Sequence, residues 1–197
     1  MPVRLNGSTS GFVELAAPAV AGSTTLELPT DSIKPGLVLL AQESFSAVST
    51  VSVDSVFSAE YDNYRLVASI TGSTSLLMLA RLRASGTDDT GTNYSRNELV
   101  GATTPSATRS TGQTSFYFIA GETYGPTTQV ADIYNPAKAA YTRVTSQMAW
   151  SSSATNPTLI MHMNQHALAS AYDGMTFFTS TGTATGSLSI FAYRSTL

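Results

Sequence analysis

The sequence predicts an all-β protein, an antiparallel β-sandwich (jelly-roll-like) preceded by an extended N-terminal arm. Three observations predict this fold class. From Phe45 onward, apolar and polar residues alternate with period two in many short stretches. Gly, Pro, Asn, Ser and Thr separate these stretches, as in sandwiches with tight turns. No stretch of helical periodicity is long enough to connect two parallel strands.

The arm is predicted by the first 30 residues. They hold short apolar pieces separated by Gly, Ser, Thr, Pro and Ala, and no piece is long enough to close a core. We expect these apolar residues to contact a partner: Val3, Leu5, Phe12, Val13, Leu15, Leu26 and Leu28. Such a segment is ordered mainly on another surface, for example as a strand added to a neighbouring sheet edge. We place the arm and linker at 1–43 and the sandwich at 44–197.

The strands of the sandwich are expected where the alternation is clearest. In 64–70, for example, Tyr64, Leu66 and Ala68 alternate with Arg65 and Val67. The expected strands lie at 37–42, 48–53, 64–70, 76–83, 116–120, 143–150, 159–163, 176–179 and 188–194. Two further windows, 136–140 and 165–172, are compatible with short helices.

Composition narrows the possible partners. Charged residues make up only 12% of the 197-residue chain, about half of the roughly 25% usual for globular domains. Ser and Thr together number 55, so hydroxyl groups must cover much of the surface. Weak charge lowers the repulsion between copies and favours self-association. A net charge of −3 with two lysines indicates no nucleic-acid partner, because phosphate binding needs a cationic face.

Other classes are excluded by what the sequence lacks. The chain has no Cys, which excludes disulfides, thiolate metal sites and a Cys nucleophile, and fits synthesis in a reducing cytosol. The longest apolar runs, such as 76–80, are far shorter than the ~18–20 residues that span a bilayer. The first 30 residues lack the apolar block of a secretory signal. We therefore predict no membrane partner and no cofactor.

Two motifs could hold a metal ion. His162 and His166 are four residues apart and would share one face of a helix, but Met163 stands where a zincin has its Glu. On a strand the two residues would lie about 13 Å apart, which favours polar residues at a strand end or subunit contact. The oxygen-rich stretch 86–93 could bind calcium, although it lacks EF-hand spacing. A solvated hairpin loop is the favoured interpretation, so no metal site is predicted.

Catalytic motifs are similarly weak. Asp54, Glu60 and Asp62 are nearby carboxylates that could serve a glycosidase, which needs an acid and a base across a cleft. A turn between strands, with Asp62 making local backbone hydrogen bonds, is the favoured interpretation. The chain has no G-x-S-x-G elbow and no glycine-rich phosphate loop. We therefore predict no catalytic residues and no enzymatic activity.

Arginine and tyrosine residues allow two interpretations. The arginines could form a patch for anions or sugars, or could pair with carboxylates across strands: Arg65, Arg81, Arg83, Arg96 and Arg143. The tyrosines could stack on sugars, or lie at interfaces and core edges: Tyr94, Tyr117, Tyr124, Tyr134, Tyr141, Tyr172 and Tyr193. The second interpretation is favoured for both groups.

Three parts of the chain together resemble bacteriophage virion proteins of the tail-fibre or capsid-decoration type. The first is LNGSTSGFVEL at 5–15 with APAVAGSTTLELP at 17–29, which is similar to their attachment segments. The middle part comprises VSVDSVF at 51–57, YDNYR at 61–65, LRASG at 82–86 and NY at 93–94. The last is TGSLSIFAYR at 185–194, similar to a closing strand.

The resemblance implies a non-enzymatic structural protein of the virion, assembled in the host cytoplasm. It implies a homotrimer that is anchored to other virion proteins by its N-terminal arm. It does not separate a tail fibre from a capsid-decorating component. The alternative is a host-surface carbohydrate-binding module, for which a host glycan would be a further partner.

Overall fold

The structure, a computed structural model, describes residues 3–6, 12–15, 36–151, 153 and 155–194. This part of the chain is all-β, so it contains no helix that could span a membrane. The chain divides into two compact units, Met1–Ile33 and Lys34–Leu197.

The first unit contains two short antiparallel strands, β1 (Val3–Asn6) and β2 (Phe12–Leu15). Their register pairs Val3 with Leu15 and Leu5 with Val13. The predicted contact residues Leu26 and Leu28 lie outside the described residues. Binding of this segment to a partner therefore stays a prediction.

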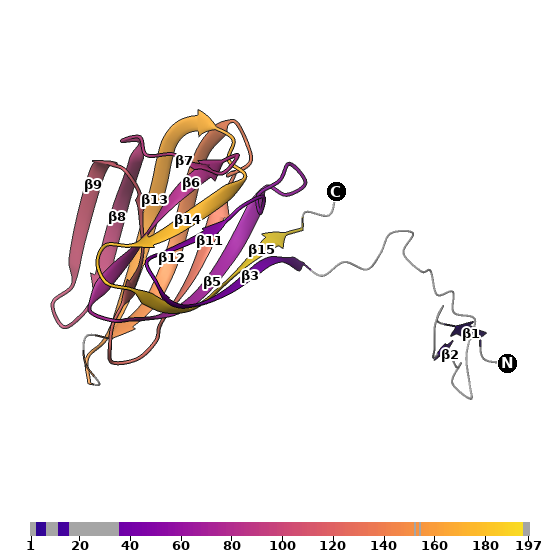
Figure 1. Cartoon of the computed structure of the whole chain (residues 1–197), viewed down its shortest axis with the longest axis horizontal. Helices are drawn as coiled ribbons and strands as arrows, with labels where there is room; N and C mark the ends of the chain where they lie inside the picture. The colour runs from indigo at the N-terminus through magenta and orange to yellow at the C-terminus, as the bar shows by residue number, and fades with distance from the viewer. Residues whose placement is uncertain (1–2, 7–11, 16–35, 152, 154, 195–197) are drawn as a thin grey trace. The chain divides into compact units, whose positions relative to one another are not determined.

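The second unit is an antiparallel β-sandwich, which confirms the predicted fold class (Figure 1). Its thirteen strands are β3 (Leu37–Val48), β4 (Thr50–Val53), β5 (Asn63–Gly72), β6 (Leu76–Ala84), β7 (Thr87–Asp88), β8 (Tyr94–Gly101), β9 (Ser106–Gln113), β10 (Phe116–Gly121), β11 (Thr127–Tyr134), β12 (Ala140–Ser151), β13 (Pro157–Ser170), β14 (Gly174–Thr179) and β15 (Ala184–Tyr193). One sheet has eight strands in the order β3-β15-β5-β11-β12-β13-β8-β9. The other has β10-β6-β14-β4, with β7 paired to β6.

The core lies between the two sheets and follows the alternation of the sequence. Tyr64, Leu66 and Ile70 of β5 are at most 1% exposed, as the period-two pattern predicts. On the five-stranded sheet, Leu82 and Phe177 are fully buried. The strand predicted at 37–42 extends to Val48 as β3 and pairs with β15, so it is part of the sandwich.

Several local expectations were wrong. The window 165–172 is not a helix, because β13 continues to Ser170 and pairs with β8 and β12. The window 136–140 is a turn that leads into β12. Four strands of the sandwich were missed: β7, β8, β9 and β11. The strand β9 has the sequence SATRSTGQ, and no pattern of apolar residues marks it.

The orientation of β13 is the most informative departure from the usual pattern. Its apolar residues Leu159, Met161 and Met163 share a face as predicted, but that face is exposed. The opposite face, which is buried in the sandwich, carries His162, Asn164 and His166 among others. The strand therefore places apolar side chains in solvent and polar side chains inside.

Candidate functional site

The exposed face of the eight-stranded sheet carries a contiguous apolar patch. We call this face the outer face, and we define the apolar patch as Val67, Leu99, Val130, Leu159, Met161 and Met163. Leu99 is 56% exposed, Leu159 49% and Met161 41%. Scattered exposed apolar residues are normal, but a contiguous group on one face is typical of an interaction surface.

Strand register explains why the members of the apolar patch are neighbours. Met161 lies directly opposite Leu99 on β8 and opposite Gln147 on β12. Gln147 lies opposite Val130 on β11, which in turn lies opposite Val67 on β5. Directly paired side chains in an antiparallel sheet are about 5 Å apart on the same face. The row therefore runs across five strands and is interrupted by a single polar residue.

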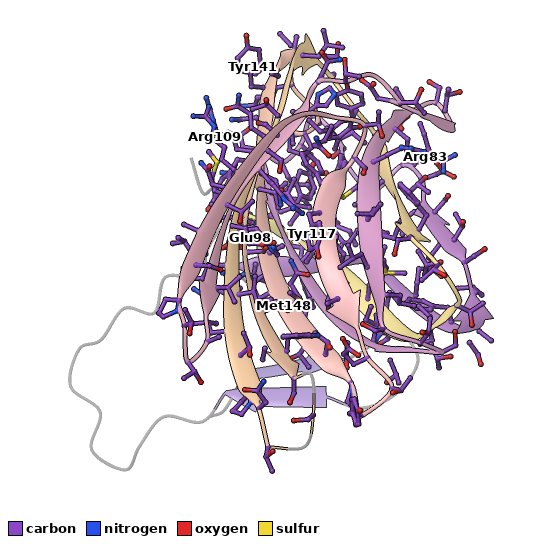
Figure 2. All side chains as sticks on the ribbon, turned by 90° about the vertical axis from the view of Figure 1, so that its left-hand side faces the viewer. Arg83, Glu98, Arg109, Tyr117, Tyr141 and Met148 are labelled. Atoms are coloured by element: carbon purple, nitrogen blue, oxygen red, sulfur yellow. The ribbon has the colours of Figure 1, made fainter. Side chains whose placement is uncertain are left out.

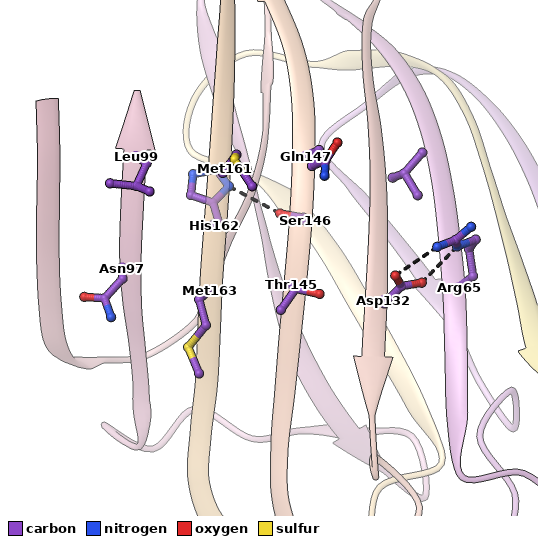
Figure 3. Close-up of a pocket in the computed structure, with 11 residues that line it drawn as sticks. Arg65, Asn97, Leu99, Asp132, Thr145, Ser146, Gln147, Met161, His162 and Met163 are labelled. Carbon is purple, nitrogen blue, oxygen red and sulfur yellow. Dashed lines mark hydrogen bonds and ion pairs between the residues drawn. The ribbon is translucent and has the colours of Figure 1, made fainter. Parts of the chain in front are cut away.

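A shallow groove of about 510 Å³ crosses this face (Figure 3). Met161, Met163 and Leu99 line one side of it, and Arg65 and Asp132 line the other. Arg65 donates to Asp132 through Nε and Nη2, both at 2.9 Å. These hydrogen bonds, with one from Tyr193, outweigh burial and lower the pKa of Asp132. The pair is therefore neutral as a whole, which leaves the groove with little net charge.

The two histidines are inside the sandwich, each beside a carboxylate. His162 Nε2 lies 3.0 Å from Glu98 Oε2, and its Nδ1 lies 3.4 Å from Ser146 Oγ. His166 Nε2 lies 3.2 Å from Asp89 Oδ2 without forming a hydrogen bond to it. The prediction that the histidines sit at a strand end or subunit contact is wrong. Their register positions on one strand also keep them from sharing a metal ion.

Burial governs how the histidines and Asp89 titrate. Burial lowers the pKa of His162 and of His166, and the neighbouring Glu98 and Asp89 offset only part of this effect. Burial alone would raise the pKa of Asp89, but hydrogen bonds from Tyr172 and from Gly91 N outweigh it and lower the pKa. Both histidines are therefore neutral in the folded protein near pH 7.

Ser146, His162 and Glu98 are in contact in the same sequence as the serine, histidine and carboxylate of a hydrolytic triad. Their burial, however, does not suit catalysis. Only 5% of Ser146 and 3% of His162 is exposed. A nucleophile must reach the carbonyl carbon of a substrate, and this hydroxyl lies between two sheets. The three residues instead satisfy one another's polar groups within the core.

The other predicted carboxylates pair with cations or backbone groups. Asp54 binds Arg83 at 2.8 Å, and Asp62 binds Lys138 at 2.7 Å. In the 86–93 stretch, Asp88 accepts a hydrogen bond from Thr176 at 2.6 Å and Asp89 accepts one from Tyr172 at 2.6 Å. The stretch begins in the hairpin between β6 and β7, with Thr87 and Thr90 exposed, and its two aspartates are bound to the sandwich. The described residues contain no cluster of metal-binding side chains.

The arginines and tyrosines divide between pairing and packing. Arg65 and Arg83 pair with carboxylates across strands, as expected. Arg81 and Arg96 lie over the rings of Phe178 and Tyr117, and Arg143 donates to Gln165. Tyr94 is fully buried and Tyr172 nearly so. Tyr124 lies in the loop between β10 and β11 and Tyr141 lies near the start of β12, and both are exposed.

Comparisons of the chain with known protein families, with curated proteins and with solved structures gave no match. The functional proposal therefore depends on the fold and on the surfaces described above.

Proposed function

We propose that this chain is a non-enzymatic structural component of a bacteriophage virion. Its sandwich self-associates, as a homotrimer, and its N-terminal arm anchors it to other virion proteins. It acts as a tail-fibre-type or capsid-decorating component. The observation that carries the proposal is the apolar patch on the outer face, because an isolated soluble domain gains nothing from exposing such a surface.

Charge supports the same proposal. The outer face carries the internally paired Arg65 and Asp132, and Arg143 is engaged by Gln165. A face with little net charge does not repel other copies of the chain, so the neighbouring subunits of a trimer are acceptable partners. The low charge of the whole chain has the same effect.

The size of the outer face also suits association. Eight strands spaced ~4.8 Å apart, paired over about eight residues of ~3.3 Å, give a face of roughly 900 Å². A stable interface covers about 800 Å² per partner. One sheet face is therefore large enough to hold copies of the chain together.

The arm is supported by the division of the chain into two units and by the resemblance of 5–29 to phage attachment segments. Deleting residues 1–30 should leave the sandwich folded and abolish incorporation of the chain into particles. Mass spectrometry of purified particles, produced with either the full or the truncated chain, measures incorporation. The same measurement gives the copy number of the full chain, for which a high value would indicate capsid decoration and a low value a tail component. Normal incorporation of the truncated chain would contradict the proposed anchoring.

A further inference from the structure

A second surface feature lies away from the outer face, between the two sheets. A cleft of about 380 Å³ opens beside β10, the edge strand of the five-stranded sheet. We call it the edge cleft and define it by Glu98, Tyr117, Glu122, Trp150 and Ser180, which line it with several aliphatic side chains. Figure 2 looks onto this side of the sandwich, where Glu98 and Tyr117 lie next to each other. The volume is within the range of small-molecule sites.

Glu122 is the residue in the edge cleft that most needs an explanation. It is 7% exposed, and among the described residues it has no cationic partner. Ser75 Oγ and Trp150 Nε1 both donate to the same carboxylate oxygen, Oε1, at 2.9 and 3.2 Å. Within the described part of the chain, Oε2 has no hydrogen-bond partner. Oε2 is not among the fully buried atoms that lack a partner, so it is accessible from the edge cleft and can accept a hydrogen bond from a ligand.

The other groups in the edge cleft define what could bind there. Glu98 adds a second carboxylate, so the cleft offers acceptors. The hydroxyl of Ser180 accepts from Leu77 N at 3.0 Å, which leaves its proton free to donate. Burial raises the pKa of Tyr117, which keeps its phenol protonated as a donor. The edge cleft therefore presents donors and acceptors together.

Aromatic and aliphatic side chains complete the edge cleft. Tyr117 and Trp150 provide ring surfaces, and Leu76, Val100 and Ile160 provide apolar contacts. A ligand that fits has hydroxyl groups, which both donate and accept, and C–H faces that pack on rings. An ammonium ion only donates and would leave the hydroxyl donors unused. An anion would face two carboxylates.

We propose that the edge cleft binds a neutral saccharide, with Glu122 Oε2 accepting from a sugar hydroxyl. This proposal goes beyond the assembly function and depends on different residues. It would also give the chain the capacity to recognise a host-surface glycan.

Trp150 provides a direct readout, because it is the only tryptophan in the chain and its indole N–H binds Glu122. We would titrate the full chain with methyl glycosides of galactose, glucose, mannose, rhamnose and N-acetylglucosamine while recording tryptophan fluorescence. At least one neutral sugar should change the emission, and glucuronic acid should bind more weakly than glucose. Methylammonium chloride is the cation probe.

The matched variants are Glu122→Gln in the edge cleft and Glu43→Gln on the exposed part of β3. Glu122→Gln should weaken sugar binding about ten-fold or more, since it removes a charge-assisted hydrogen bond. Tyr117→Phe, which removes one hydroxyl, should weaken binding less, and Glu43→Gln should have no effect. Thermal unfolding of each variant verifies folding, and Tyr117→Phe keeps the test decisive if Glu122→Gln unfolds.

Three results would overturn the proposal. One is no response to any neutral sugar at tens of millimolar. Another is sugar binding that both Glu122→Gln and Tyr117→Phe leave intact, and the third is a response to methylammonium alone. Because the edge cleft is separate from the apolar patch, these results would leave self-association unaffected. Failure of one proposal can thus be distinguished from failure of the other.

Discussion

At the residue scale, the polar groups inside the sandwich are organised as small paired networks. Glu98 is hydrogen-bonded to His162. Asp89 accepts hydrogen bonds from Tyr172 and from Gly91 N, and it lies beside His166. No sequence signal could have shown these partners, because Glu98 and His162 are 64 residues apart and meet only through the pairing of β8 with β13. The histidines were predicted as an i, i+4 pair, but their functional neighbours are across the sheet.

The histidines make stability depend on pH. The pKa of His162 is lower in the folded than in the unfolded chain. As the pH falls below about 6.5, the unfolded chain therefore binds a proton more readily than the folded chain, and the free energy of unfolding decreases. Above that pH both states hold a neutral His162, and the free energy of unfolding is not reduced by this residue. The groups that face His162 are Glu98 and Arg96 of β8, Ser146 of β12 and the Tyr117 ring of β10. Urea unfolding should give a lower free energy at pH 5.5 than at pH 7.5, one unit either side of about 6.5. His162→Gln should reduce this difference, and a pH-independent wild-type protein would contradict the assignment.

Asp89 should contribute far more to the free energy of unfolding than an exposed carboxylate does. Asp89→Ala leaves Tyr172 without its acceptor and removes the carboxylate beside His166, and it should cost about 3 kcal/mol of unfolding free energy. The matched control is Asp62→Ala, which removes an exposed ion pair with Lys138 and should cost less than about 1 kcal/mol. Chemical denaturation of both variants tests this. Equal losses of unfolding free energy in the two variants would show that the contacts of Asp89 stabilise the fold no more than an exposed ion pair does.

At the element scale, alternation identifies strands but does not say which face is buried. For β5 the apolar face is the core face, as predicted, whereas for β13 the apolar face is exposed. Period two is the same in both cases, and only the pairing of β13 between β12 and β8 determines which side meets the other sheet. The strand β9 was missed because it is exposed on both faces, so ladder hydrogen bonds rather than burial hold it in place.

Adjacent residues of β13 should therefore respond in opposite ways. Met161→Lys puts a charge in the apolar patch and should abolish self-association while changing the unfolding free energy by less than about 0.5 kcal/mol. Ile160→Ala, on the core face, should cost about 2–4 kcal/mol. Size-exclusion chromatography and denaturation measure the two effects. Thr50→Lys, on β4 of the other sheet, is the charge control and should leave association intact; disruption by both lysines would argue against a specific patch.

At the scale of the whole molecule, the core belongs to the second unit. All buried apolar residues of the described chain lie between Val53 and Ala192. The fold class and most of the strands were predictable from sequence because period-two patterning is a local property. The sheet order, the edge cleft and the apolar patch were not, since they depend on pairing between segments distant in the chain.

The sandwich should accordingly fold without the first unit. A chain of residues 34–197 should unfold within about 2 °C of the full chain, because no described core residue is removed. Differential scanning calorimetry measures both proteins at the same concentration. A large drop in the unfolding temperature would show that the first unit stabilises the sandwich and is not chiefly an anchor.

The most direct test of self-assembly is the mass of the purified full chain in solution, measured by sedimentation equilibrium over a wide concentration range. We expect a single species of three times the 20.7 kDa chain mass. A monomer at every concentration would contradict it.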